Sequence, residues 1–204
     1  MKKLFYSAMV ALMMLSATTN TNAQAWSKDS KILALGLGAS EFFHIDGDSK
    51  ASSVYGTAPL WLTGQLNFQG EFGVHDYVGI GFTTGLGGRA GYSRGFGYFG
   101  YYSSYGYSGE VNVPIGVIAN FHFYQLIADK TGKDIHSDKL DVYAGLSVGT
   151  GMAATFYPNA THIYPIAFGG PHVGARYYFT DKFGVNLEAG FGKSLINGGI
   201  VFKL

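Results

Sequence analysis

The feature that most constrains the fold of this chain is the alternation of apolar and polar residues with a period of two. Between Phe183 and Phe191, odd positions carry Phe, Val, Leu or Ala, and even positions carry Gly, Asn or Glu. The segments 60–74 and 140–150 alternate in the same way. Successive side chains of a β-strand point to opposite faces, so this pattern predicts strands with one apolar face and one polar face.

The same template predicts eight strands along the chain. Most of them reach the ~9–11 residues that a tilted strand needs to cross a membrane. Their predicted ranges are 31–44, 58–74, 78–88, 108–123, 140–152, 165–179, 183–193 and 196–204. An even number of antiparallel strands returns both ends of a barrel to the same side.

The predicted connections between these strands are of two kinds. His75–Tyr77 and Thr180–Lys182 are short enough for tight turns, whereas 45–57, 89–107 and 155–164 are long. Short turns that alternate with long loops are typical of a membrane barrel with periplasmic turns and extracellular loops.

Some features depart from this regular pattern. The connection 124–139 is long although it lies on the turn side, and the link near Ser194 is short although it lies on the loop side. Pro114 and Pro171 fall inside predicted strands, where a residue without an N–H breaks the hydrogen-bond ladder. We therefore expect a bulge at each proline, or a strand that begins later.

Period alone does not show which face is inside, and a soluble β-sandwich or lipocalin-like barrel would have the apolar face inward. Composition favours the membrane. Only 13% of the residues are charged, against roughly 25% in a typical soluble domain. The polar face also carries many of the 31 glycines, which suit the crowded lumen of a narrow barrel.

Aromatic residues near the strand ends indicate an interfacial girdle, as in outer-membrane barrels. These residues are Phe72, Phe121, Phe123, Tyr177, Phe179 and Phe183. The sequence therefore predicts an all-β fold, an eight-stranded antiparallel transmembrane β-barrel that is inserted as a monomer in the outer membrane.

The first 25 residues have the order of a secretory signal peptide. Lys2 and Lys3 precede an apolar stretch, 4–16, that is shorter than the ~20 residues of a membrane-spanning helix. Small residues follow, and the cut is expected after Ala23 or after Ala25. The predicted organisation is a signal peptide over 1–25 and an outer-membrane barrel domain over 26–204.

The last predicted strand carries a terminal pattern of a polar residue, a glycine and two hydrophobic positions, formed by Asn197, Gly199, Phe202 and Leu204. With the strand count and the alternation of turns and loops, it resembles the small eight-stranded outer-membrane proteins of the OmpA/OmpX type. The resemblance implies that the barrel-assembly machinery reads this terminus during insertion. Leu204 stands where the family usually has Phe.

Ionisable residues on the polar face are the candidate site residues. Strand parity places in the lumen Glu71, Glu110, Asp141, Arg176, Glu188 and Lys203, together with His122 and His172. Arg176 is expected opposite Asn186 and one diagonal step from Glu188, where the two charges can pair. Such a layer fits a structural ion-pair network, or alternatively an ion gate.

No catalytic, metal or cofactor site is predicted. The chain has no cysteine, and it lacks the metalloprotease, P-loop and paired-cysteine motifs. His136-Ser137 and Thr161-His162 are the only candidates for a lipid A-modifying hydrolase or acyltransferase, and neither has the expected spacing.

The remaining predictions concern partners and role. The near-neutral charge, +1 at pH 7, gives no footprint for nucleic acid, whereas outer-membrane lipid and lipopolysaccharide are expected partners. The Tyr-rich loop 89–107 is a candidate surface for a ligand, because aromatic residues are good contact anchors. The predicted role is structural, with presentation of surface loops; the alternatives are a small gated pore and a lipid-modifying enzyme.

Overall fold

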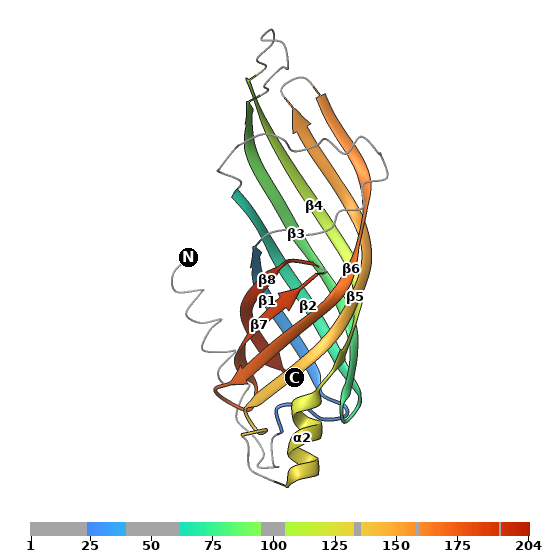
Figure 1. Cartoon of the computed structure of the whole chain (residues 1–204), viewed down its shortest axis with the longest axis vertical. Coiled ribbons are helices and arrows are strands. Elements are labelled where there is room, and N and C mark those ends of the chain that lie inside the picture. The colour runs from blue at the N-terminus through green and yellow to red at the C-terminus, as the bar shows by residue number, and fades with distance from the viewer. Residues whose placement is uncertain (1–23, 40–61, 95–104, 133–135, 158–159, 192) are drawn as a thin grey trace.

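The computed structural model describes residues 24–39, 62–94, 105–132, 136–157, 160–191 and 193–204. Eight strands form a closed barrel in the order β1 to β8, each antiparallel to its neighbours (Figure 1). The strands are β1 (Lys31–Ala39), β2 (Leu62–His75), β3 (Val78–Arg94), β4 (Tyr105–Phe121), β5 (Leu140–Tyr157), β6 (Ala160–Tyr178), β7 (Phe183–Gly190) and β8 (Ile196–Lys203). The predicted eight-stranded antiparallel barrel is confirmed.

The alternation in the sequence becomes an inside and an outside. In β7, Phe183, Val185 and Leu187 are exposed, whereas Asn186 and Glu188 are buried. The other strands alternate in the same way: their outward positions are mostly apolar, and their inward positions carry most of the buried polar and charged side chains, together with some apolar ones such as Ile118 and Phe168. This arrangement is the reverse of a lipocalin-like barrel, in which the apolar side chains point inward.

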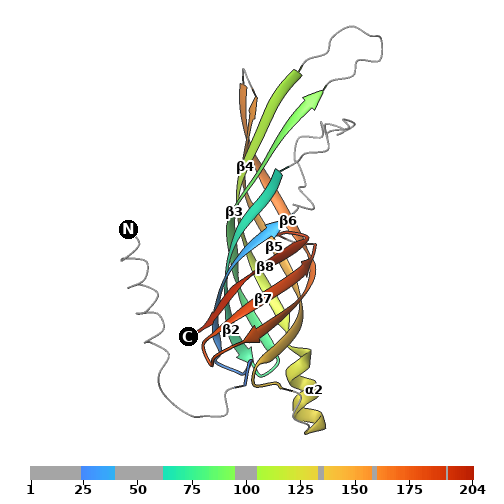
Figure 2. The ribbon, with the colours of Figure 1, turned by 90° about the vertical axis from the view of Figure 1, so that its left-hand side faces the viewer.

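The wall of the barrel is uneven in height. Strands β3 to β6 have 17 to 19 residues, whereas β7 and β8 have 8 each. The long strands rise together beyond the short ones, away from the end where the C-terminus lies (Figures 1 and 2).

The long strands correct two predicted loops. The predicted loop 155–164 is wrong, because β5 continues to Tyr157 and pairs with β6 from Ala160. Small residues such as Ala153 and Ala154 give this region little polar contrast, so the period of two is hard to see there. The predicted loop 89–107 shrinks, since β3 and β4 occupy both its ends; its middle part and the loop 45–57 lie outside the described residues.

Pro114 and Pro171, the two prolines expected to disturb their strands, produce no bulge, contrary to the expectation. Pro114 pairs with Gly151 and Pro171 with Leu146 in unbroken registers. The carbonyl of Pro114 accepts a hydrogen bond from Thr84 and that of Pro171 one from Phe191. A strand residue turns its N and its C=O to the same side, so each missing N–H faces β3 or β7. At both places the ladder is interrupted or has not yet begun.

The long connection on the turn side contains a helix that the sequence pattern did not predict, α2 (Phe123–Thr131). It ends at Gly132, whose φ of 62° is the left-handed conformation that glycine adopts without strain. We call this end of the barrel the α2 end and the opposite one the far end (Figure 1). In the described part of the chain, no helix has the length and apolar character needed to cross a membrane.

Candidate functional site

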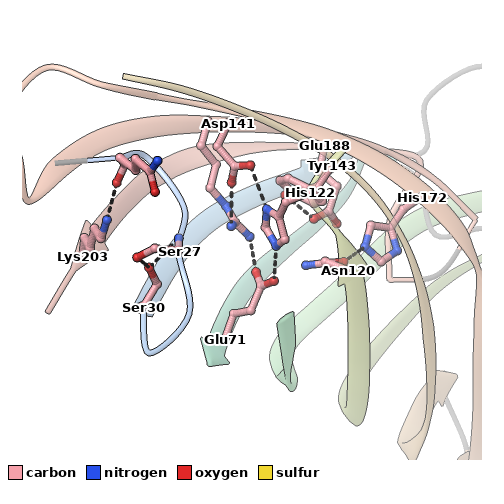
Figure 3. A network of polar contacts seen from close by, with 12 residues as sticks. Ser27, Ser30, Glu71, Asn120, His122, Asp141, Tyr143, His172, Glu188 and Lys203 are labelled. Atoms are coloured by element: carbon pink, nitrogen blue, oxygen red, sulfur yellow. Dashed lines mark hydrogen bonds and ion pairs between the residues drawn. The ribbon is translucent and has the colours of Figure 1, made fainter. Parts of the chain in front are cut away.

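The most concentrated set of charged residues in the described lumen lies near the α2 end. Strand parity points Glu71 of β2, Asp141 of β5 and Arg176 of β6 inward, and His122 stands between β4 and the first residue of α2. All four side chains are buried, with at most 2% of their surface exposed. We call these four residues the charged ring; Glu71, His122 and Asp141 are seen turned toward one another in Figure 3.

The four residues form a closed cycle of contacts. The Nε2 atom of His122 lies 3.0 Å from Oε1 of Glu71, and its Nδ1 atom lies 2.7 Å from Oδ1 of Asp141. Arg176 donates to Oδ2 of Asp141 at 3.2 Å and to Oε2 of Glu71. Each carboxylate therefore bridges the two basic residues with its two oxygen atoms.

The geometry also indicates the charge of His122. An ionised carboxylate only accepts hydrogen bonds, and both ring nitrogens of His122 face one. With Glu71 and Asp141 both ionised against Arg176, both ring nitrogens donate, and the side chain of His122 is an imidazolium. Two positive and two negative charges alternate around the ring, so a group that would be very costly to bury alone is compensated.

Aromatic rings cover the charged ring on two sides. The indole of Trp26 stacks on His122, with ring centroids 3.5 Å apart and planes inclined by 6°. The guanidinium carbon of Arg176 lies 4.3 Å from the ring centroid of Tyr143. Both arrangements suit a cation against the negative face of an aromatic ring.

Glycines make room for these aromatic side chains, as the sequence predicts for the inward face. A Cβ atom on Gly79 would lie 2.6 Å from the indole of Trp26, and one on Gly174 would lie 2.5 Å from the hydroxyl of Tyr143. Real Cβ atoms do not approach that closely. The indole of Trp26 and the ring of Tyr143 therefore occupy space that a side chain at Gly79 or Gly174 would take.

Glu188 belongs to a second layer toward the far end, rather than to the charged ring. The predicted cross-strand pairing of Arg176 with Asn186 is present, but Arg176 contacts Glu71 and Asp141. Glu188 instead pairs with Lys193 at 2.8 Å and accepts a hydrogen bond of 3.0 Å from Tyr143. The expected Arg176–Glu188 contact is wrong, because a pattern within one hairpin cannot reveal partners across the lumen.

Lys193 is a charged lumen residue that the strand pattern did not predict. It lies in the short connection between β7 and β8, which folds Lys193 and Ser194 into the lumen. The ammonium of Lys193 also donates to Gln69 of β2. The sequence signal for this arrangement is the unusually short link near Ser194, which is too short to form a loop outside the barrel.

Further polar pairs tie the remaining strands together. His172 donates to Asn120 at 2.8 Å, and Asn67 donates to Asn197 at 2.9 Å. Glu110 stands apart, nearer the far end, where it accepts a hydrogen bond of 2.9 Å from Tyr164. Most polar groups that the described lumen encloses thus have a partner on another strand, as a stable interior requires.

Lys203 lies at the α2 end of the barrel, where it meets the N-terminal residues. Its half-buried ammonium donates to the backbone carbonyl of Gln24. We call residues Gln24–Ser30 the strap. The strap also bonds to the α2–β5 link, where Ala25 donates to Ser137 at 2.8 Å, and to β2, where Gly73 donates to Ser30 at 2.8 Å.

Three of the predicted assembly residues, Asn197, Gly199 and Phe202, lie in β8, which closes the barrel between β1 and β7, and Leu204 follows the end of this strand. Asn197 faces the lumen, Gly199 pairs with Gly36, and the ring of Phe202 lies 5.4 Å from that of Phe183. Leu204 is exposed. Their reading by the assembly machinery stays a prediction.

The two histidine motifs weighed for catalysis lie at opposite ends of the barrel. His136 precedes β5, whereas His162 pairs with Thr155 near the other end of that strand. At a rise of about 3.3 Å per residue, β5 runs about 50 Å along its own direction from Leu140 to Thr155. Among the described residues, no group of His, Asp and Glu is placed to hold a metal ion.

Comparison with known proteins finds no matching family model and no matching curated protein. Among solved structures, the chain is similar to the N-terminal β-barrel domain of Pseudomonas aeruginosa OprF. The TM-score is 0.48 at 12% identity, over 87% of this chain and 98% of that one. It is also similar to Ail, the attachment invasion locus protein of Yersinia pestis, with a TM-score of 0.41 at 10% identity, over 86% and 95% of the two chains.

Proposed function

We propose that this chain is an integral outer-membrane β-barrel whose lumen is closed and whose role is structural, with presentation of the connections at its far end. The observation that carries the proposal is the distribution of polarity over the closed barrel. Its outward positions are apolar and its inward positions hold the charges.

The outer surface has the character that hydrocarbon requires. Exposed large apolar residues occur on all eight strands, among them Leu37 of β1, Leu146 of β5 and Leu187 of β7, each at least 60% exposed. On the outward strand faces whose side chains are described, Lys31 is the one Lys, Arg, Asp or Glu, and it lies at the α2 end. A water-soluble protein rarely exposes an apolar surface of this extent.

Aromatic residues mark one boundary of the apolar surface. Phe72, Phe121, Tyr177, Phe179 and Phe183 are exposed around the α2 end. The rings of Tyr177, Phe179 and Phe183 follow one another at centroid distances of 5.5 and 6.2 Å. Such a belt is typical of a membrane–water interface, which supports a position of α2 in the water-filled periplasm. Phe123, also expected in the girdle, opens α2 instead.

The contacts across the lumen support a scaffold in preference to a pore. The charged ring spans β2, β5 and β6, and Tyr143 links it to the layer of Glu188 and Lys193. Eight strands leave an interior just wide enough for side chains. Ion pairs that cross this interior join distant strands and occupy the path that a solute would take.

Membrane fractionation tests the placement. The mature protein should sediment with the outer membrane, resist carbonate extraction and migrate faster on a gel before heating than after it. Recovery as a soluble periplasmic monomer would contradict the proposal.

A small gated pore is the second candidate, favoured by the ionisable side chains that meet across the lumen, Glu71, Asp141 and Arg176 among them. Single-channel recordings separate the two roles. The scaffold predicts no conductance in the parent protein, whereas a gate predicts openings that change steeply with pH or with Arg176→Ala.

A further inference from the structure

The contacts of the strap distinguish the two positions at which the signal peptide could be cleaved. The sequence admits a cut after Ala23 or after Ala25. From the contacts of Gln24, Ala25 and Trp26, we propose that the mature chain begins at Gln24, so that the whole strap belongs to the finished barrel. This inference rests on the proposed export of the protein.

Burial is the first argument. A new N-terminus carries an ammonium group, and an unpaired charge is costly to remove from water. Gln24 is exposed, whereas Ala25 is 2% and Trp26 0% exposed. A chain that began at Trp26 would place its ammonium on a residue packed in an apolar cluster with Ile32, Ala34, Tyr178 and Val201.

Hydrogen bonds are the second argument. The N–H of Ala25 donates to the carbonyl of Ser137 at 2.8 Å, and the carbonyl of Gln24 accepts from Lys203. A cut after Ala25 removes both contacts. It would detach the strap from the α2–β5 link and from the end of β8, and it would leave the half-buried ammonium of Lys203 without this acceptor.

Packing gives Ala25 a role that is independent of any peptidase. Its side chain is enclosed in the same cluster as Trp26, where a larger residue would have to displace its neighbours. An alanine at position 25 is therefore explained by the barrel itself. The match of Ala23-Gln24-Ala25 to the cleavage rule therefore does not require a cut after Ala25. Ala23 can still be the last residue of the signal peptide, with the cut before Gln24.

The direct test identifies the N-terminal peptide of the protein made in a Gram-negative host. The full chain is expressed, outer membranes are isolated, and the terminal peptide is read by mass spectrometry. We expect it to begin at Gln24. A start at Trp26 would overturn this inference alone, whereas a chain that retains Met1 would contradict the proposed export as well.

A second test measures what the two residues contribute. Chains that begin at Gln24 or at Trp26 are prepared with a removable tag that leaves no extra residue, refolded into lipid and unfolded in urea. The chain from Gln24 should have the higher urea midpoint. Gln24→Ala in that chain is the matched control, because it keeps both backbone contacts, and its midpoint should match that of the parent. Equal midpoints for the two starts would overturn the structural basis of the inference.

Discussion

The outer face and the lumen of this barrel are built from alternate residues of the same strands, yet they have opposite chemistry. In β7, Leu187 is 60% exposed, whereas the next residue, Glu188, is 4% exposed. A soluble barrel keeps its apolar residues on the enclosed side. Here the enclosed side holds ion pairs, so the barrel cannot derive its stability mainly from an apolar core.

This difference shows which face of the barrel specifies the register of its strands. The backbone ladder closes the cylinder, and the apolar exterior matches hydrocarbon at any rotation around the axis. The charged ring, by contrast, needs Glu71, His122, Asp141 and Arg176 in one register. A shift of one residue in β2 or β6 would turn Glu71 or Arg176 outward, which the apolar exterior already opposes, whereas a shift of two residues keeps every side chain on its face but separates the partners of the charged ring. The interior therefore specifies the register that the exterior cannot.

Removing Arg176 should give the largest effect on the lumen side. Arg176→Ala leaves two buried carboxylates with His122 as the remaining cation of the charged ring, and the loss of one partner of a buried pair costs about 3–5 kcal/mol. Urea unfolding of the refolded barrel in lipid measures this. Arg176→Lys, which keeps the charge but cannot bridge two carboxylates as a planar fork, should fall between. An Arg176→Ala variant as stable as the parent would show that the charged ring does not stabilise the barrel.

A charge on the outer face should cost nearly as much. Leu146→Arg places a cation in hydrocarbon, for which about 2–4 kcal/mol is expected near the midplane. Leu146→Met is the matched control and should be tolerated. Arginine at the neighbouring inward position, Ser147, should be milder where it fits. Equal or reversed penalties at Leu146 and Ser147 would mean that inside and outside are interchanged.

The contact between the two lumen layers should be weaker. Tyr143→Phe keeps the ring beneath Arg176 but removes the hydroxyl that donates to Glu188. Because Lys193 still pairs with Glu188, we expect a loss of about 1 kcal/mol. The same unfolding assay measures it. A loss as large as that of Arg176→Ala would mean that the layers form a single unit.

The smallest effect is expected outside the barrel wall. Tyr77 donates a hydrogen bond of 3.0 Å to Asp129 of α2, which raises the pKa of Tyr77 above its ordinary value. The contact is present below the ordinary pKa of tyrosine and is lost as the pH rises through the raised one. Absorbance titration of the phenolate should show the shift, and Asp129→Asn should reduce it with little change in stability. A titration unchanged by Asp129→Asn would exclude the contact.

The inward and outward faces of the strands could largely be predicted from the sequence, because strands with one polar and one apolar face alternate with a period of two. The alternation from Phe183 to Phe191 predicts β7, and the same parity places Glu71, Asp141 and Arg176 on the inward side. The ends of β5 and β6 could not be predicted, since Gly and Ala occupy both faces near Met152.

The partners within the lumen were also beyond the sequence. Glu71 and Arg176 are 105 residues apart, and their contact depends on the diameter and stagger of the closed barrel. Trp26 belonged to no predicted strand, so nothing indicated that it would stack on His122. The alternation within a strand predicts to which face a side chain points. Its contacts across the lumen depend on how the barrel closes.

Lipid contact at single positions tests the central claim most directly. The chain has no cysteine, so one fluorophore can be attached at Leu146→Cys or Val148→Cys, on the outer face of β5, or at Lys130→Cys, on exposed α2. With the barrel in bilayers of brominated lipid, we predict strong quenching at Leu146 and Val148 and none at Lys130. Labels at Leu146 and Val148 that are quenched by aqueous iodide and not by the brominated lipid would contradict the account.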